Sequence, residues 1–396
     1  MNESGSRSML RVRAAHQHHR VTAVELFFDL VFVFAVTQIS HALLKDFSLL
    51  GAARVTLLFL AVWWVWIFTS WVTNWLDPDR TPVRILLFLL MLGGLVLSTS
   101  LPAAFGTRGF AFGLAFAAMQ VGRSAVTLGL LPASEQGMRR NFVRILTWLS
   151  VSGVLWIAGG LADPQTRLVL WALAVFIEYM GPVTRFRTPG LGASTYDDWN
   201  VEGGHMAERS SAFILIALGE SVVVTGATFA DLAWSSATIA AFVASFVGSI
   251  AMWWIYFHKG AEAGSERISS AEDPGRIARL TYTYFHMPIV AGIILSAVAD
   301  ELVLAHPAGH ADLKTVLSAA GGPLLFLIGT ILFKRSIHGI WQPSHMAGIA
   351  ALLVLAAVGA LMSPLLLSVL TTVVLTVVAA WEAISLGASA VPGGRT

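Results

Sequence analysis

Hydrophobic and polar positions divide the chain into long blocks, in which apolar runs of about 17 to 25 residues alternate with short charged, Pro- or Gly-containing breaks. A run of this length crosses a bilayer as a helix, and no segment has the alternating pattern of a membrane barrel strand. The pattern predicts about twelve transmembrane helices. Their expected ranges are 23–43, 52–73, 83–102, 109–130, 142–161, 166–183, 207–229, 235–257, 278–299, 314–333, 345–361 and 365–386. The last two are divided only by SPLL at 363, which is compatible with either a turn or a kink.

The composition agrees with this pattern. Of 396 residues, 56% are hydrophobic and 12% charged, and the mean hydropathy is +0.73, whereas about a quarter of a soluble domain is charged. The chain is therefore predicted to be an all-α polytopic membrane protein, with membrane lipids as its surroundings. The absence of Cys excludes disulfides and thiol chemistry, and a net charge of +2 gives no reason to expect nucleic acid.

The basic residues orient the chain. If the N-terminus is cytoplasmic, only five of the 25 Lys and Arg residues fall on the outer side of the membrane. These five are Lys45, Arg54, Arg108, Arg167 and Lys314. The positive-inside rule therefore predicts an even number of spans with both termini in the cytoplasm.

The two halves of the chain look like one duplicated unit. Glu25 aligns with Glu208, AVWWVWIF (61–68) with AMWWIYFH (251–258), and FIEYMG (176–181) with AWEAIS (380–385). Six spans per half predict two parallel repeats related by an axis along the membrane normal; the alternative is chance similarity among apolar helices. The predicted parts are a polar cytoplasmic tail (1–20), the first six-helix repeat (21–183), a cytoplasmic linker (184–206), the second repeat (207–386) and a cytoplasmic C-terminal tail (387–396).

Ionisable residues interrupt the first span. The stretch ELFFDLVFVFAVTQISH (25–41) is apolar yet carries Glu25, Asp29 and Gln38. Ionisable groups in hydrocarbon are costly and usually face a protein interior or a water path. Glu25 and Asp29 are four residues apart, on one face of a helix. The structural alternative is that such acids cap the helix start at the membrane interface.

The stretch HMAERSSAFILIALGES (205–221) has the same plan. His205, Glu208, Arg209 and Glu220 share a stripe about 120° wide on a helical wheel. Arg209 could pair with Glu208 or with an acid on the first span. Glu220 is about 16 Å further along the helix, with no Lys or Arg near it in the sequence, which makes it a candidate proton carrier or cation ligand. Its structural alternative is a protonated acid bonded to a neighbouring helix.

A third polar stripe follows the ninth span. Tyr282, His286 and Asp300 fall within about 60° on a helical wheel, together with Arg279. Histidine titrates near neutral pH and suits a proton relay. Pro288 frees a backbone carbonyl, so His286 could instead bond a carbonyl at a kink.

The motifs resemble those of the bacterial low temperature requirement A (LtrA) family. The matching pieces are ELFFDLVFVFAVTQISH, WWVWIFTSWVTNWLDPDRTPVR (63–84), HMAERSSAFILIALGES and YTYFHMPIVAGIILSAVADE (282–301). The resemblance implies a polytopic protein of the bacterial inner membrane, linked by name to growth in the cold, and it implies no particular substrate. The phenylalanine-aspartate pair of the first span also looks like the endolysosomal and bacterial potassium channel family, as an analogy of organisation.

These patterns favour a transporter or channel for a small solute or ion, linked to protons. Neither a Walker-type loop nor an HExxH or GxSxG motif is present, so we expect no enzyme activity, no catalytic residues, no cofactor and no metal site; HQHH at 16–19 is read as a flexible tail. Glu220 is the predicted proton or cation site, Glu25 and Asp29 its counterpart, Arg209 the counter-charge and His286 a relay. The alternatives are a lipid-modifying enzyme or sensor, and a structural or assembly protein. Self-association into a homo-oligomer is left open.

Overall fold

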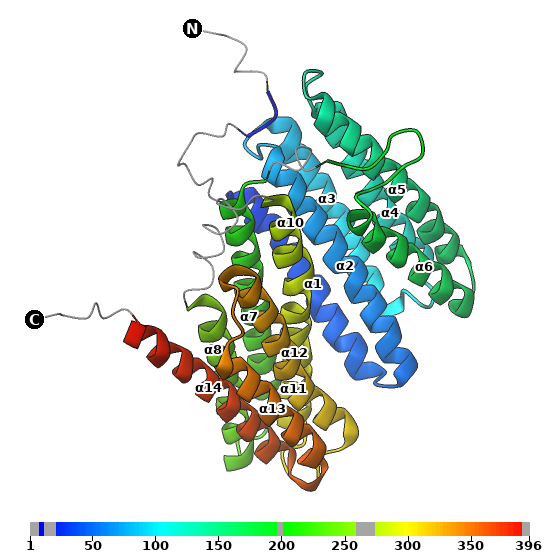
Figure 1. Cartoon of the computed structure of the whole chain (residues 1–396). Helices are drawn as coiled ribbons and strands as arrows, with labels where there is room; N and C mark the ends of the chain where they lie inside the picture. Colours follow the sequence, from blue (N-terminus) through cyan, green and yellow to red (C-terminus); the bar gives the residue numbers. More distant parts are fainter. Residues whose placement is uncertain (1–7, 12–20, 196–200, 259–273, 390–396) are drawn as a thin grey trace, which may run out of the picture. The chain divides into compact units, whose positions relative to one another are not determined.

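The structure, a computed structural model, describes residues 8–11, 21–195, 201–258 and 274–389. Its regular elements are helices, which Figure 1 labels. Twelve helices of the described part are long and apolar enough to cross a membrane, which confirms the all-α polytopic prediction. The elements are α1 (Ala23–Lys45), α2 (Leu49–Trp75), α3 (Thr81–Ser100), η2 (Leu101–Ala103), α4 (Gly109–Leu130), α5 (Gln136–Leu161), α6 (Pro164–Val183), α7 (Gly203–Ala230), α8 (Ser236–Phe257), α10 (Pro274–Ala278), η4 (Arg279–Phe285), α11 (His286–Ala305), α12 (Leu313–His338), α13 (Pro343–Val358), η5 (Gly359–Leu361) and α14 (Pro364–Ser389).

The helices extend beyond the predicted apolar runs where polar residues cap or continue them. α2 begins at Leu49, because Ser48 Oγ accepts a hydrogen bond from Gly51 N at 3.0 Å and caps the first turn. The ninth span continues to Ala305, past the acidic pair that ended the apolar run. The last two spans are separate helices joined by a turn rather than one kinked helix.

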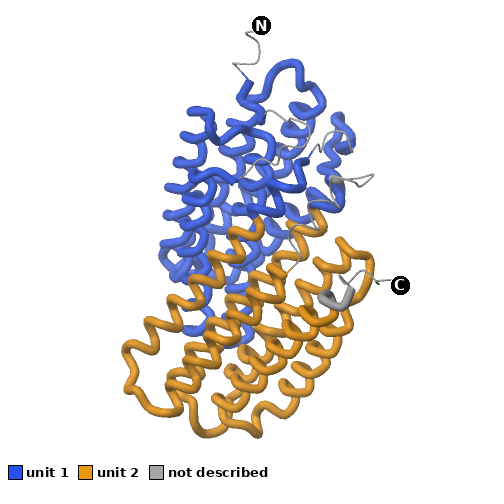
Figure 2. The backbone as a smooth tube through the Cα atoms, turned by 90° about the vertical axis from the view of Figure 1, so that its left-hand side faces the viewer, with its two compact units in different colours: residues 1–209, 268–278 blue, residues 210–267, 279–396 orange. Residues whose placement is uncertain are grey.

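The chain divides into two compact units, coloured separately in Figure 2. Unit 1 comprises residues 1–209 and 268–278, and unit 2 comprises residues 210–267 and 279–396. The division falls inside α7, between Arg209 and Ser210. The arrangement of the halves as two parallel repeats stays a prediction.

Unit 1 is built around α2. In the apolar window of this helix 83% of the residues are buried, and Trp63, Trp64 and Trp66 are at most 2% exposed. α1, α4 and α6 each pack against α2. The aromatic run is therefore part of the packed interior of unit 1. A buried polar chain holds α4, α5 and α6 together, since Glu178 accepts hydrogen bonds from Gln120 at 2.6 Å and Ser152 at 2.7 Å.

In unit 2, α11 packs closely along α12, and α8 along α14. The close approach depends on Gly292, where a Cβ would lie 2.5 Å from the backbone N of Phe326. A buried ion pair joins α12 to α14, with Lys334 Nζ 2.6 Å from Glu382 Oε2. Each unit thus carries a buried glutamate on its last long helix, Glu178 in α6 and Glu382 in α14.

Candidate functional site

Three helices of unit 1 bring buried polar side chains together, and each helix presents them at four-residue spacing. We call this set, together with Arg11, the buried ion-pair cluster. Its members are Glu25 and Asp29 on α1, Trp66, Ser70 and Asn74 on α2, His205 and Arg209 on α7, and Arg11. Arg11 is 9% exposed and every other member is 0% exposed, so the cluster is shielded from solvent.

Glu25 combines the two roles that its sequence position allowed. It is the third residue of α1 and accepts hydrogen bonds from Thr22 N and Thr22 Oγ1, both at 2.9 Å, so it closes the first turn of the helix. It also binds the Arg11 guanidinium at 3.1 Å and His205 Nε2 at 2.8 Å. Both oxygens of this carboxylate therefore accept hydrogen bonds.

Arg11 joins the cluster from the N-terminal segment, which the sequence predicts to be a polar cytoplasmic tail. Arg11 N donates to Trp75 O at 2.9 Å, and Asp77 N donates to Met9 O at 2.9 Å, so residues 9–11 run beside the end of α2. Arg11 Nε donates to Thr73 O at 2.7 Å. The segment thus inserts a cation beside Glu25, which hydropathy cannot indicate because the flanking sequence is polar.

The contacts of His205 assign its tautomer. Glu202 N donates to Asn74 Oδ1 at 3.0 Å, and Asn74 Nδ2 donates to Glu202 O at 2.9 Å, which fixes the orientation of the Asn74 amide. That amide turns its NH₂ group toward His205 Nδ1 at 3.3 Å, so Nδ1 accepts and Nε2–H donates to Glu25. A protonated ring would place an N–H against an NH₂ group. The Asn74 contact therefore favours a neutral ring, while Nε2 faces both the Glu25 carboxylate and Arg11 Nη2, the latter at 3.1 Å.

Asp29 and Arg209 form the pair at the centre of the cluster. Arg209 Nη2 lies 2.8 Å from Asp29 Oδ1 and 3.2 Å from Ser70 Oγ, and Trp66 Nε1 donates to the same Asp29 oxygen at 2.8 Å. Arg209 Nη1 lies 4.0 Å from Glu25 Oε1. The structure thus pairs Arg209 with the first span and not with Glu208, which is exposed and accepts a hydrogen bond from Val21 N.

The central pair leaves polar atoms unsatisfied. Among the described residues, Asp29 Oδ2, Arg209 Nε and Arg209 Nη1 have no hydrogen-bond partner, although each is buried. Unsatisfied buried groups of this kind are costly and call for an explanation. Asp29 is thus unlike Glu25: one of its oxygens is free to take a proton.

The formal charges of the cluster balance. Two carboxylates face two guanidiniums, and His205 is neutral. Protonation of Asp29 would leave an excess positive charge and remove the ion partner of Arg209. The next acid within reach of Arg209 is Glu25, so the arrangement can respond to one proton by a change of pairing.

The remaining predicted site residues lie apart from these contacts. Gln38 is half-buried on α1, three turns or so beyond Glu25, and Glu220 is half-buried on α7 in unit 2. Tyr282 and Asp300 also belong to unit 2. The HQHH stretch at 16–19 lies outside the described residues.

His286, in unit 2, has both ring nitrogens engaged. Nδ1 donates to Thr281 O at 2.8 Å, within the π-helical segment η4, and Nε2 accepts from Tyr256 Oη at 2.8 Å. These are the contacts that the structural alternative requires for this residue. A relay role for His286 stays a prediction.

Sequence reasoning missed four members of the cluster: Arg11, Trp66, Ser70 and Asn74. The three on α2 were hidden in an aromatic, apolar run that indicates packing. Their i, i+4, i+8 spacing, which puts an indole N–H, a hydroxyl and an amide on one face, is the signal that could have found them.

Comparison with known proteins adds a family. The model of the bacterial low temperature requirement A protein (LtrA) matches residues 20–380. A curated protein of Rhizobium meliloti (strain 1021), described as uncharacterized, is 42% identical over 363 residues, which is 91% of this chain and 88% of that protein. No solved structure matches the chain.

Proposed function

The chain belongs to the bacterial low temperature requirement A family, and we propose that it moves a small solute or ion across the membrane in a proton-linked manner. The single observation that carries the proposal is the buried ion-pair cluster of unit 1. In this proposal the protein is a transporter or channel rather than an enzyme. It lies in the bacterial inner membrane with both termini in the cytoplasm, in accord with the distribution of basic residues.

Stability alone gives little reason to keep such a cluster. A buried ion pair often contributes no more than well-packed apolar residues of similar volume, because desolvation offsets the attraction between the charges. Here two acids and two guanidiniums are buried together, three of them on helices and Arg11 on the N-terminal segment. Ionisable groups inside membrane proteins commonly mark proton relays and ion paths, which supports a functional role.

Asp29 is the proton site in this proposal, in place of Glu220, which the sequence pattern favoured for that role. Its Oδ2 is buried without a partner, whereas the oxygens of Glu25 accept hydrogen bonds from Thr22, Arg11 and His205. A proton on Asp29 releases Arg209, which can then turn toward Glu25, 4.0 Å away. Loss of the proton restores the 2.8 Å pair.

The change of pairing would couple the protonation of Asp29 to the contact between α1 and α7. Asp29 and Glu25 are on α1, and Arg209 is on α7, so the proton state of Asp29 changes what holds α1 to the first turns of α7. A transport cycle needs such a bistable element, whose two states differ in charge pairing.

The test is flux in proteoliposomes. Purified protein is reconstituted with a pH-sensitive dye inside, and Na⁺, K⁺, Li⁺ or amino acid gradients are imposed one at a time. We expect at least one gradient to drive proton movement above that of protein-free liposomes. Asp29→Asn, which keeps the shape and can still accept from Trp66 and Arg209, should abolish the coupled proton movement.

Asp46→Asn is the matched control, because Asp46 follows the end of α1 and is exposed. It should behave like the unmodified protein. Proton-coupled flux that persists at its full rate in Asp29→Asn would refute the assignment of the proton site.

A further inference from the structure

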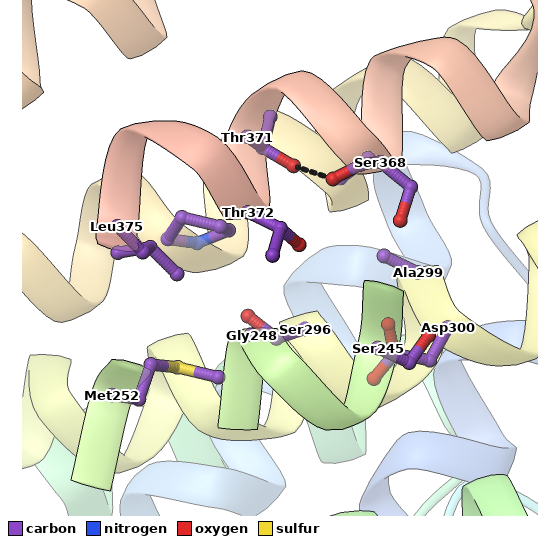
Figure 3. A pocket seen from close by; sticks show the side chains of 12 residues that line it. Ser245, Gly248, Met252, Ser296, Ala299, Asp300, Ser368, Thr371, Thr372 and Leu375 are labelled. Atoms are coloured by element: carbon purple, nitrogen blue, oxygen red, sulfur yellow. Dashed lines mark hydrogen bonds between the residues drawn. The ribbon is translucent and has the colours of Figure 1, made fainter. Parts of the chain in front are cut away.

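Unit 2 contains a small polar cavity between α8, α11, α12 and α14 (Figure 3). Its volume, measured as the space open to the centres of water molecules, is about 30 Å³. One water molecule needs only ~10–15 Å³ by this measure, so the cavity has room for one small ion with a water. The lining residues are Ser245, Gly248, Met252, Ser296, Ala299, Asp300, Ala319, Pro323, Ser368, Thr371, Thr372 and Leu375.

The lining is rich in oxygen. Asp300 supplies the single carboxylate, and five hydroxyl side chains surround the same space. The lining includes no Lys, Arg or His, and no ion pair among the described residues involves Asp300. One negative charge is thus enclosed by neutral oxygen ligands, the donor type that hard cations prefer.

One of the hydroxyls lacks a partner. Ser296 Oγ is buried and makes no hydrogen bond to a described residue. In Figure 3, Ser245 lies beside Asp300. A buried hydroxyl without a partner is costly, and a bound ion or water would satisfy Ser296.

Two further hydroxyls, those of Thr371 and Thr372, present lone pairs rather than protons. Thr371 Oγ1 donates its proton to Ser368 O at 3.0 Å, and Thr372 Oγ1 donates to Ala244 O at 3.2 Å. Their oxygens can therefore still coordinate a cation.

α12 has one helical carbonyl without its usual donor near the cavity. Pro323, inside the helix, has no N–H to donate to the carbonyl of Ala319, four residues earlier, and both residues line the cavity. Carbonyls released from helical hydrogen bonds are ligands for Na⁺ in membrane transporters.

We propose that this cavity binds one small monovalent cation of the size of Na⁺, held by Asp300 and the surrounding hydroxyls. The single carboxylate would not neutralise a divalent ion, because Ca²⁺ and Mg²⁺ sites are usually built from more than one carboxylate or from phosphates. The inference stands apart from the transport proposal, since equilibrium binding tests it and flux tests the other.

The experiment measures binding of ²²Na⁺ to the purified full-length protein, with unlabelled NaCl, LiCl, KCl and choline chloride as competitors. We expect saturable binding of one Na⁺ per chain, competed by Na⁺ and not by choline. Asp300→Asn should abolish saturable binding. Glu301→Gln removes the neighbouring acid of α11 that does not line the cavity, and it should bind as the unmodified protein does.

Ser296→Ala is the second variant, which decides the matter if Asp300→Asn fails to fold. It should weaken Na⁺ binding at least about fivefold while the helices stay intact. Absence of saturable binding in the unmodified protein, equal competition by choline, or unchanged binding in either cavity variant would overturn the proposal.

Discussion

Replacing Arg209 tests the energetics of the buried ion-pair cluster. Arg209→Met keeps an unbranched side chain but removes the guanidinium that binds Asp29 at 2.8 Å and Ser70 at 3.2 Å. Asp29 then keeps the Trp66 indole as its hydrogen-bond donor but loses the cation that pairs with it. We expect the free energy of unfolding to fall by about 3–5 kcal/mol, the range for breaking a fully buried pair.

The double variant Asp29→Leu with Arg209→Met provides the sharper comparison. Because it removes both charges, it should be more stable than the sum of the two single changes by at least ~2 kcal/mol. Unfolding in mixed detergent micelles can be followed by the fluorescence of the 14 tryptophans. Arg84→Met, which breaks a more exposed pair with Asp79 at 3.3 Å, is the control and should cost about 0–1 kcal/mol. Strict additivity of the two single changes would refute the reasoning.

Three further predictions concern the fold. Gly292→Ala should destabilise unit 2 by about 1–3 kcal/mol, since its Cβ would press on the α12 backbone, whereas Gly226→Ala, with open space around it, should be tolerated in the same unfolding assay. Hydrogen bonds from Thr166 hold the pKa of Asp163 below its usual value at the start of α6. Its stabilisation is present above the unfolded pKa of about 3.9 and disappears as the pH falls, so the deficit of Asp163→Ala at pH 7 should close in acid. A cysteine at position 135 of this Cys-free chain should resist an impermeant reagent added outside intact cells; labelling would refute the cytoplasmic assignment.

The helices were predictable because a segment that crosses the hydrocarbon core must hydrogen-bond its own backbone. Each span needs an apolar run of sufficient length, and such runs are visible in the sequence without knowledge of packing. Helix ends were less predictable. Some depend on caps such as Ser48. Others depend on acids such as Asp300, which ended the apolar run in the sequence but lies inside α11 in the structure.

The site was predictable only in part. Four-residue spacing placed Glu25 and Asp29 on one face of the first span. The sequence left open whether Arg209 pairs with Glu208 or with an acid of the first span, and in the structure it pairs with Asp29. The position of Arg11 depends on a short backbone pairing with the end of α2, which leaves no periodic signal. The orientation of Asn74, and hence the tautomer of His205, depends on contacts across more than a hundred residues of sequence.

The central claim is that Asp29 gains and loses a proton beside Arg209. Infrared difference spectroscopy between acidic and alkaline buffer, on the reconstituted protein, measures protonated carboxyl groups directly and needs no knowledge of the substrate. We predict a protonated-carboxyl component that is lost in Asp29→Asn and retained in Glu220→Gln. A component that persists in Asp29→Asn and disappears in Glu220→Gln would contradict the account.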